Sequence, residues 1–430
     1  MSETPPSAAT AESDLTGPRK RAPTGLVVAA FVMTMSSSFG QTYFIGVFAP
    51  SVKGALTLTD GAFGGLYTVA NLASALVLLW AGRIADRFRI RWLAVAVLLA
   101  LAAMCAAMAA VVSVWMLVPV LFGLRLFGQG AIGHLAITGV GRWYVRRRGR
   151  MMSIAVLGFS AGEAMLPISA VALIASAGWR EAWLLAAGAL CVVSVPLVLF
   201  FLRREPAHDQ EAETSDKPAA PQRQWTRAEV IRRPEFFGVV AGIVAPGFIV
   251  TAIFFHQGTI VETNGWTLAW FAGWVPAYAL TTIMMALVTG WLVDRFGARP
   301  ILPLYLLPMA GGVVVLALWA SPYAVAVFML LSALTTGSAA TLLGALWAEL
   351  FGTRHLGAIR SVAVATQIFV SALAPGLIGV LLDLGAGLDV LLLAMAAYAV
   401  ACSLWLKLLV PRLVRLAHIR PGERSHPAPA

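Results

Sequence analysis

Two charged side chains, Arg125 and Glu163, stand deep inside long apolar stretches of this 430-residue chain. A charge within a membrane-spanning helix costs about 2.5–3.5 kcal/mol on insertion scales, so such residues usually face a cavity or a partner. The number of residues from Arg125 to the basic residue Arg142 is similar to the number from the basic residue Arg150 to Glu163. Because each helical residue adds the same rise, the two side chains reach a similar depth. Adjacent antiparallel helices would let them pair.

Two interpretations of these charges are open. In the first, Arg125 and Glu163 form a structural ion pair that holds two helices together. In the second, Arg125 binds an anionic substrate, and Glu163 takes up a proton once the substrate occupies the arginine, because a nearby guanidinium favours the ionised carboxylate. The equivalent positions in the second copy of an internal repeat are Ala333 and Ser371, so the second half folds without such a pair. This asymmetry favours the functional interpretation.

Other polar residues in the same apolar stretches are candidates for substrate contact. Gln129 lies one helical turn after Arg125 and therefore shares its face, and Tyr67 and Asn71 share a face at i, i+4. We predict a substrate site that combines Arg125 with the polar residues Gln129, Gln41, Tyr43, Tyr67, Asn71, His256 and Gln257. Glu163 is the predicted proton-coupling residue.

The composition places these residues in a membrane protein. Apolar residues make up 60% of the chain and charged residues 12%, whereas soluble domains have about 45–50% and about 25%. The net charge of +11 comes from short basic clusters between apolar runs, so it does not indicate nucleic-acid binding. Cys105, Cys191 and Cys402 have neither metal-ligand nor disulfide spacing. We expect no metal and no cofactor.

Apolar runs of about 20 residues predict an all-α integral membrane protein with twelve transmembrane helices in two pseudo-symmetric six-helix bundles. The predicted spans are 25–49, 61–82, 92–112, 114–141, 151–177, 182–202, 236–261, 268–293, 300–320, 323–350, 357–382 and 388–410. The corresponding domains are a disordered cytoplasmic tail (1–24), the N-terminal bundle (25–202), a cytoplasmic linker (203–235), the C-terminal bundle (236–410) and a second cytoplasmic tail (411–430).

Lysine and arginine set the orientation, because they concentrate in cytoplasmic loops. With both termini in the cytoplasm, every lysine and arginine falls on that side except Lys53 and Arg180, which lie on the other, and Arg125, which lies within a span. We therefore expect a monomeric, multi-pass protein of the cell's inner (plasma) membrane, whose partners are the lipid bilayer and a small anionic solute.

The two halves carry the same landmarks at one constant offset. Gly82, Asp86 and Arg87 recur in the second half as Gly290, Asp294 and Arg295. Gly149 and Pro167 recur at the same offset as Gly357 and Pro375. Two independent matches in one register indicate duplication of a six-helix unit, which is a plan of secondary transporters.

The sequences GRIADRFRIR (82–91), GWLVDRFGAR (290–299) and RLFGQG (125–130) resemble signatures of the major facilitator superfamily, and the resemblance covers all but the tails. It implies that the Asp and Arg of the loop motif form a conformational latch that stabilises the outward-facing state. That role falls on Gly82, Asp86, Arg87, Gly290, Asp294 and Arg295. The stretch 142–167 and GWREAW (178–183) also look similar to the oxalate/formate and monocarboxylate porters.

Together these features predict a secondary active transporter, not an enzyme, that moves a small organic anion such as a carboxylate by alternating access, with protons or by exchange. One alternative is a proton-antiport exporter of drugs or metabolites, in which Arg125 and Glu163 relay protons. A second alternative is a membrane enzyme or sensor on the same scaffold, although no nucleophile stands near a base and no histidine or carboxylate cluster has metal spacing.

Overall fold

The structure is a computed structural model that describes residues 25–81, 88–144, 148–204, 224–352 and 355–417. Every regular element in these ranges is a helix. Ten helical stretches are long and apolar enough to cross a membrane, and two shorter apolar helices, Gly25–Gly40 and Leu307–Leu318, occupy the predicted first and ninth spans. The predicted all-α architecture of twelve spans is confirmed.

The N-terminal bundle contains several spans built from consecutive short helical pieces. Its elements are α1 (Gly25–Ser36), η3 (Ser37–Gly40), α2 (Thr42–Ile45), η4 (Gly46–Phe48), α3 (Ala49–Leu56), α4 (Asp60–Ala81), α5 (Ile90–Ala109), α6 (Val114–Gly123), η5 (Leu124–Ile132), α7 (Gly133–Trp143), α8 (Arg148–Ala177), α9 (Trp179–Ala189), η6 (Leu190–Ser194), α10 (Val195–Phe201) and η7 (Leu202–Arg204).

The C-terminal bundle follows the same order. Its elements are α11 (Arg227–Val230), α12 (Pro234–Ile243), α13 (Ala245–Phe255), α14 (Gln257–Asn264), α15 (Leu268–Gly273), α16 (Val275–Phe296), α17 (Ala298–Ile301), α18 (Leu307–Leu318), α19 (Tyr323–Phe351), α20 (Leu356–Asp383) and α21 (Leu388–Ala417). The last helix continues to Ala417, beyond the predicted end of the bundle at 410.

Element bounds repeat at the offset found in the sequence. The shift that takes Gly82 to Gly290 also takes both ends of the short helix α3 to those of α14, and the first residue of α8 to that of α20. The same shift in residue number relates the two main interfaces between the bundles. It takes α4 to α16 and α8 to α20, so the contact of α4 with α20 corresponds to the contact of α16 with α8. The structure is therefore a duplicated bundle whose copies pack through equivalent helices.

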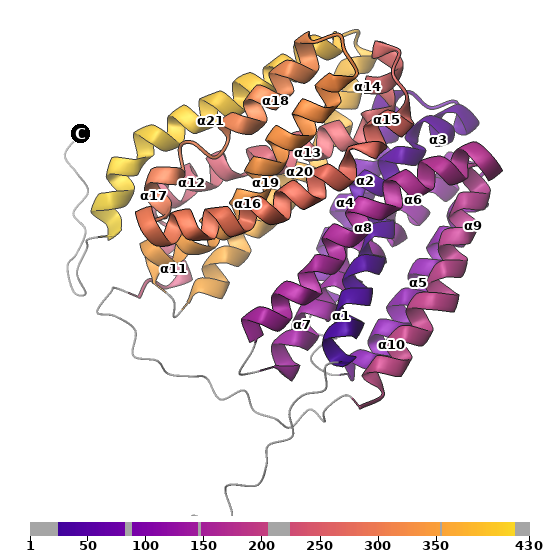
Figure 1. Ribbon diagram of the computed structural model, residues 1–430, viewed down its shortest axis with the longest axis horizontal. Coiled ribbons are helices and arrows are strands. Elements are labelled where there is room, and N and C mark those ends of the chain that lie inside the picture. Colours follow the sequence, from indigo (N-terminus) through magenta and orange to yellow (C-terminus); the bar gives the residue numbers. More distant parts are fainter. Residues whose placement is uncertain (1–24, 82–87, 145–147, 205–223, 353–354, 418–430) are drawn as a thin grey trace, which may run out of the picture.

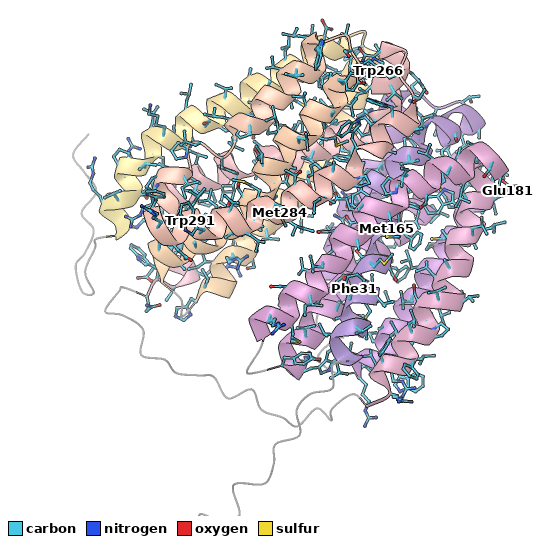
Figure 2. All side chains as sticks on the ribbon, viewed as in Figure 1. Phe31, Met165, Glu181, Trp266, Met284 and Trp291 are labelled. Carbon is cyan, nitrogen blue, oxygen red and sulfur yellow. The ribbon has the colours of Figure 1, made fainter. Side chains whose placement is uncertain are left out.

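Each bundle has its own apolar core, and the two cores meet at one end of the molecule. Figure 1 shows the bundles in contact around α2, α4, α13 and α14 and diverging toward α7 on one side and α11 on the other. Phe255 at the end of α13 belongs to the C-terminal half, yet its buried side chain packs in the N-terminal core. In Figure 2, Trp266 lies at this joined end and Trp291 lies at the opposite end of the second bundle.

Glycines allow α4 and α20 to touch backbone to backbone at the joined end. A Cβ on Gly64 would overlap the carbonyl oxygen of Pro375, and a Cβ on Gly379 would overlap that of Asp60. The equivalent of Gly379 in the related interface is Val171. Because van der Waals packing holds membrane helices together, small residues at the contact strengthen the α4–α20 interface relative to its copy.

Part of the predicted cytoplasmic linker is ordered against the C-terminal bundle. The backbone N–H of Trp225 donates to the carbonyl of Phe351 at 3.0 Å, and the Trp225 side chain is buried. Thr226 and Glu229 form a reciprocal capping box that begins α11. The described end of the linker thus belongs to the C-terminal unit.

Replacement of Gly64 by alanine should weaken closure of the joined end, because the added methyl group meets the Pro375 carbonyl. Gly65→Ala is the matched control, since a Cβ there has no neighbour within 4 Å. Overpacking typically costs about 1–3 kcal/mol, so Gly64→Ala should shift the equilibrium by about fivefold or more toward separation at this end. Spin labels on Gly54→Cys and Thr263→Cys, in a background without the native cysteines, would report the distance. Equal distance distributions in the two alanine variants would contradict the packing argument.

Candidate functional site

Arg125 lies on a π-helical segment in the middle of the fourth span. This segment, η5, joins α6 to α7, and the three pieces form one continuous stretch from Val114 to Trp143. π-Helical turns are rare and often coincide with functional sites. The Arg125 side chain is only 2% exposed. Its charge is therefore held inside the bundle and away from lipid.

The first span is broken next to Arg125. The helix ends at Gly40, and Gln41 has extended backbone with φ −85° and ψ 154°. A Cβ on Gly40 would overlap the carbonyl oxygen of Leu124, and a Cβ on Gly128 would lie 2.6 Å from the Cα of Gly40. These two glycines let the break contact η5 directly. The carbonyl of Gly40 is thereby available to a partner outside its own helix.

The guanidinium of Arg125 uses that carbonyl and two polar side chains. Its Nη1 donates to the Gly40 oxygen at 2.9 Å and more weakly to Thr42 Oγ1 at 3.4 Å. Its Nε donates to Asn71 Oδ1 at 3.0 Å. All three acceptors are uncharged, and Nη2 makes no hydrogen bond to the part of the chain that the structure describes. The site therefore retains a positive charge and a free donor.

One face of α4 supplies the remaining contacts with Arg125. The guanidinium carbon lies 5.2 Å from the centroid of the Tyr67 ring, within the range of a cation–π interaction. The Tyr67 hydroxyl and Thr42 Oγ1 are 2.8 Å apart and share a hydrogen bond. Tyr67 and Asn71 lie one turn apart on the same face, as the sequence predicted, and both reach Arg125. The sequence analysis missed Thr42 as a partner of this arginine.

Glu163 does not pair with Arg125, contrary to the geometry expected from their similar depth. The η3 segment packs against both η5 and α8. A Cβ on Gly162 of α8 would overlap Ser38 Oγ, so α8 contacts this segment closely. Glu163 is instead half-buried on α8, which packs against α2 of the first bundle and α16 of the second. The broken first span replaces the carboxylate as the partner of Arg125.

The other predicted substrate residues in the N-terminal bundle are half-buried near the break. Gln41 Nε2 donates to Ser37 Oγ at 3.2 Å. The Tyr43 hydroxyl donates to Ser38 Oγ at 2.8 Å. Gln129 makes no side-chain hydrogen bond within the described ranges. These three side chains therefore keep polar atoms that a ligand could use.

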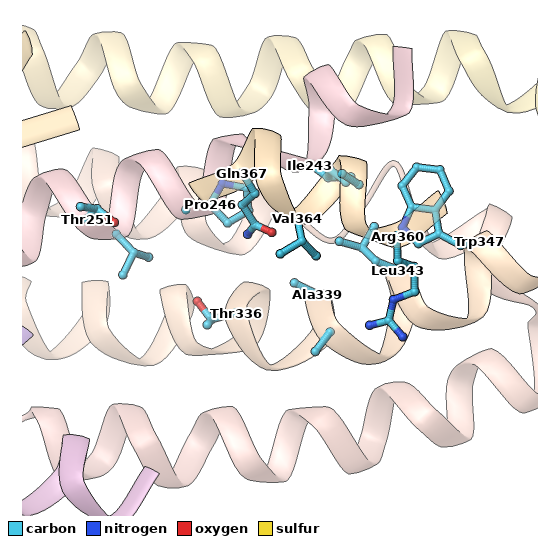
Figure 3. Close-up of a pocket in the computed structure, with 14 residues that line it drawn as sticks. Ile243, Pro246, Thr251, Thr336, Ala339, Leu343, Trp347, Arg360, Val364 and Gln367 are labelled. Carbon is cyan, nitrogen blue, oxygen red and sulfur yellow. The ribbon is translucent and has the colours of Figure 1, made fainter. Parts of the chain in front are cut away.

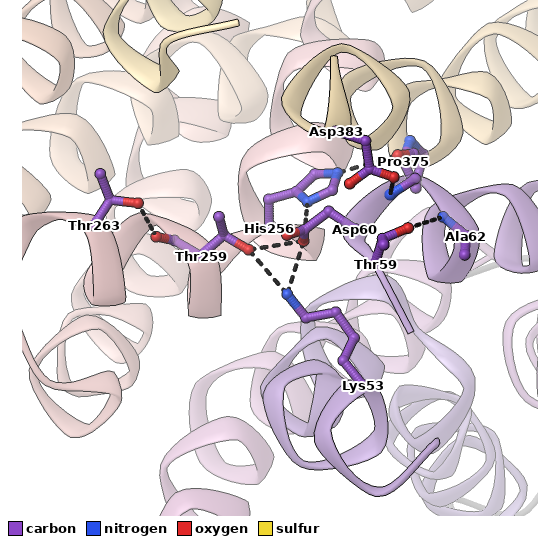
Figure 4. Close-up of polar contacts among 10 residues, drawn as sticks. Lys53, Thr59, Asp60, Ala62, His256, Thr259, Thr263, Pro375 and Asp383 are labelled. Atoms are coloured by element: carbon purple, nitrogen blue, oxygen red, sulfur yellow. Dashed lines mark hydrogen bonds and ion pairs between the residues drawn. The ribbon is translucent and has the colours of Figure 1, made fainter. Parts of the chain in front are cut away.

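The structure places His256 and Gln257 at the joined end, between the bundles. His256 Nδ1 lies 3.3 Å from Asp60 Oδ1, and its Nε2 lies 3.1 Å from the carbonyl oxygen of Pro375 (Figure 4). Gln257 is completely buried, and its Nε2 donates to the carbonyl of Tyr43 at 3.2 Å. Both residues contact the N-terminal bundle and so help to hold the two bundles together at this end.

Sequence reasoning missed the acidic and basic partners at this end. Asp60 Oδ1 accepts hydrogen bonds from Lys53 Nζ at 2.8 Å and from Thr259 Oγ1 at 2.9 Å. Asp383 Oδ2 accepts from the backbone N–H of Gly61 at 3.0 Å. The one signal was the exception to the charge rule, since Lys53 is one of two basic residues predicted on the non-cytoplasmic side.

The latch motif is described only in its second copy, because Gly82, Asp86 and Arg87 lie outside the described residues. Gly290, Asp294 and Arg295 lie on the last turns of α16. The guanidinium of Arg295 lies over the Trp291 ring at 5.7 Å, and Asp294 makes no ion pair within the described ranges. Arg299 in the following turn pairs with Glu349 of α19 at 3.3 Å.

A cavity of about 380 Å³ lies within the C-terminal bundle, between α12, α13, α19 and α20 (Figure 3). Its lining is mainly apolar and includes Trp347, with polar groups from Thr251, Thr336, Gln367 and Arg360. No part of the predicted site lines it. It offers a second place for a solute, with an apolar wall and one guanidinium.

Comparisons with known proteins agree with the fold. The family model of the Major Facilitator Superfamily matches residues 28–277 and 259–429. No curated protein matches the chain.

Similar solved structures include a bacterial homologue of the human lysosomal transporter Spinster in two inward-facing states. The unoccupied state has a TM-score of 0.65 at 15% identity and covers 91% of this chain and 95% of the other. The occupied state has a TM-score of 0.69 at 14% identity and covers 93% and 96%. A mutant of the nucleoside transporter NupG has a TM-score of 0.64 at 10% identity and covers 91% and 99%. These identities establish a shared fold only.

Asn71→Ala should destabilise the protein more than Gln129→Ala. Asn71 supplies an acceptor to a buried guanidinium, and hydrogen bonds to charged groups contribute about 1.5–3 kcal/mol. Gln129 has no hydrogen-bond partner in the described chain, so its loss should change stability little. Thermal unfolding of both variants in detergent measures the difference. A Gln129→Ala variant as unstable as Asn71→Ala would show that the Arg125 network is not the source of the effect.

Proposed function

Because this chain belongs to the Major Facilitator Superfamily, we propose that it is a secondary transporter that moves a small organic anion, with Arg125 as the contact for the substrate's carboxylate. The observation that carries this proposal is a buried guanidinium whose acceptors are all uncharged and whose Nη2 has no hydrogen-bond partner in the described ranges. A membrane location at the inner or plasma membrane, with both termini in the cytoplasm, and a monomeric state belong to the same proposal.

Electrostatics supports an anion as the missing partner of Arg125. A buried charge is costly unless it is both hydrogen-bonded and paired, and the described contacts supply hydrogen bonds and a cation–π contact but no opposite charge. Arginine stays charged, and its N–H groups form strong charge-assisted hydrogen bonds to carboxylates. Asn71 and Gly40 hold Nε and Nη1, so the free Nη2 is oriented before a ligand arrives. The polar groups of Gln41, Tyr43 and Gln129 complete the proposed site.

Glu163 supports the proposed coupling to protons. Its half-buried carboxylate lies on α8, which packs against α2 of the first bundle and α16 of the second. Separation or approach of the bundles during alternating access would therefore change its surroundings. Since the ionised form is favoured by water and by cations, this movement gives Glu163 a different proton affinity in each state. Exchange of anions without protons is the other mode open to this site.

The C-terminal cavity favours a second candidate function. A solute with a large apolar body would suit its lining better than a small carboxylate, so an exporter of lipophilic drugs or metabolites by proton antiport is the competing proposal. In that mechanism Arg125 does not contact the solute. The two candidates therefore differ in what Arg125 substitution does to ligand binding.

A thermal-shift panel of small carboxylates, inorganic oxyanions and lipophilic cations should identify carboxylates that stabilise the wild type but not Arg125→Gln. A ligand that binds only the folded protein adds about 2.7 kcal/mol at 100 times its dissociation constant. Arg180→Gln is the matched control, because Arg180 donates to the carbonyls of Ala109 and Val111 and thus serves a structural role. It should lower the melting temperature yet retain the ligand-induced shift.

The opposite pattern supports the exporter. If the same carboxylates stabilise Arg125→Gln as much as the wild type, or if only lipophilic cations stabilise both, Arg125 is not the anion contact.

Glu163→Gln should abolish proton-driven accumulation of the carboxylate and leave exchange intact. The glutamine keeps the size and polarity of the side chain but cannot release a proton. Proteoliposomes with an imposed pH gradient measure accumulation, and preloaded proteoliposomes without a gradient measure exchange. Accumulation at the wild-type level in Glu163→Gln would remove this residue from the coupling mechanism.

A further inference from the structure

The joined end contains a junction of polar groups from both bundles, formed by Lys53, Asp60, His256, Thr259, Asp383 and the carbonyl of Pro375. We call it the Asp60 junction. Asp60 Oδ1 is its centre, with Lys53 Nζ at 2.8 Å, Thr259 Oγ1 at 2.9 Å and His256 Nδ1 at 3.3 Å (Figure 4). Asp60 and Lys53 belong to the first bundle, whereas His256 and Thr259 belong to the second. The contacts therefore hold the halves together.

Both ring nitrogens of His256 face hydrogen-bond acceptors. Nδ1 faces the carboxylate of Asp60, and Nε2 faces the carbonyl oxygen of Pro375 at 3.1 Å. A neutral imidazole has one N–H and can donate to only one of them, whereas the imidazolium donates to both. The side chain is 3% exposed, so water does not readily replace a missing donor. Lys53 donates to the same oxygen of Asp60, which favours the ionised carboxylate over a protonated one.

The charged groups around His256 come from three helices. Helix α3 contributes Lys53, α4 contributes Asp60, and α20 contributes Asp383, whose Oδ2 accepts from Gly61 N. In α14, Thr259 is uncharged and Glu262 is exposed, and α13 adds the apolar Phe255. Asp383 is exposed as well, so Asp60 and Lys53 are the charges next to the ring. A neutral ring would leave one of its two acceptors without a donor.

We propose that His256 is a proton-binding site whose protonated form holds the two bundles together at the Asp60 junction. Separation of the bundles at this end removes the Asp60 acceptor, which belongs to the opposite bundle, and exposes the ring, so the proton is released. Protonation thus stabilises the conformation that is closed here and open at the opposite end, and this stabilisation is lost as the pH rises. The proposal rests on alternating access but not on the solute being an anion.

The proton at His256 enters and leaves on the side of the joined end. In the closed conformation the ring is buried among contacts from both bundles, and in the open conformation it faces the solution on that side. It therefore sets the conformational equilibrium according to the local pH and is not carried across the membrane. Under the predicted orientation this is the external side. This role is distinct from that of Glu163, which lies on α8 and is not part of the Asp60 junction.

A packed row of side chains connects the junction to Arg125. One face of α4 carries Asp60, Phe63, Tyr67 and Asn71. This row begins with Asp60 at the junction and ends with Asn71, which binds the guanidinium of Arg125. Phe255, next to His256 in the chain, stacks on Phe63 at 5.1 Å and packs on Tyr67 at 4.6 Å between ring centroids. A displacement of Tyr67 by a ligand at Arg125 would reach the residue adjacent to His256. Solute and proton can therefore act on the same closure.

The test measures closure as a function of pH without any solute. Spin labels on Gly54→Cys and Thr263→Cys, in a background lacking the native cysteines, report the distance across the joined end. Between about pH 5.5 and 8.5, where an unperturbed histidine changes charge, the wild type should lose at least about tenfold in the ratio of closed to open molecules, as expected for one charge-assisted hydrogen bond. His256→Gln should show no such change. Thr259→Val, which removes a neutral donor to the same oxygen, should retain it.

Asp60→Asn provides a second variant in case His256→Gln fails to fold. Loss of the carboxylate disfavours the imidazolium, so the midpoint of the pH response should move to lower pH. A wild type that does not respond to pH, a His256→Gln variant that responds as the wild type does, or an unmoved midpoint in Asp60→Asn would each overturn the proposal. None of these outcomes depends on ligand stabilisation through Arg125, so failure of the proposed function is recognised separately in the thermal-shift panel.

Discussion

A guanidinium in the apolar interior of a bilayer must find its hydrogen bonds within the protein, because lipid supplies none. In this chain that requirement falls on Arg125. The first span breaks at Gly40 and exposes a carbonyl, the fourth span adopts a π-helical stretch, and α4 directs Asn71 toward the same point. Irregular backbone at membrane depth is tolerated where it lines a protein interior, and the break in the first span and the π-helical stretch of the fourth both meet that condition.

Helix α4, which contacts Arg125, also joins the two bundles. Asn71 binds the arginine in the middle of α4, while Asp60 binds Lys53, Thr259 and His256 at its first turn. The face between these points is filled by aromatic rings from both bundles. Closely packed side chains transmit a displacement to their neighbours. Helix α4 is therefore the element through which substrate binding and closure of the joined end can influence each other.

Duplication explains the architecture, and departures from it explain the asymmetry. The interfaces α4–α20 and α16–α8 are copies, yet Gly379 of α20 corresponds to Val171 of α8. At the α4–α20 interface, glycines allow carbonyl groups to approach the neighbouring backbone closely. Likewise, Arg125 and Glu163 correspond to Ala333 and Ser371, so the proposed chemistry resides in one copy. The two halves therefore share one fold, whereas Arg125 and Glu163, which we propose to bind the solute and the coupled proton, occur in the first half only.

Sequence reasoning succeeded where a residue's role follows from its own helix. The shared face of Tyr67 and Asn71 depends only on helical periodicity, and both side chains reach Arg125. It failed for the expected contact between Arg125 and Glu163, because that inference assumed regular helices with nothing between them. The intervening segment is the end of the first span, and its break at Gly40 and Gln41 has no reliable signal in hydropathy. Lys53 was recognised only as an exception to the charge rule.

The sequence by itself determined that the chain lies in a lipid bilayer, where its spans are, that its two halves are copies and which family it resembles. Hydropathy, basic-residue placement and loop motifs suffice for this because they are properties of short stretches and their spacing. Tertiary structure alone decided the partners of Arg125, the place of Glu163 and the closure at Asp60. Those contacts join residues 54, 85 and 196 positions apart. They depend on a broken helix, a π-helical turn and close glycine contacts between backbones, and composition does not encode such distances.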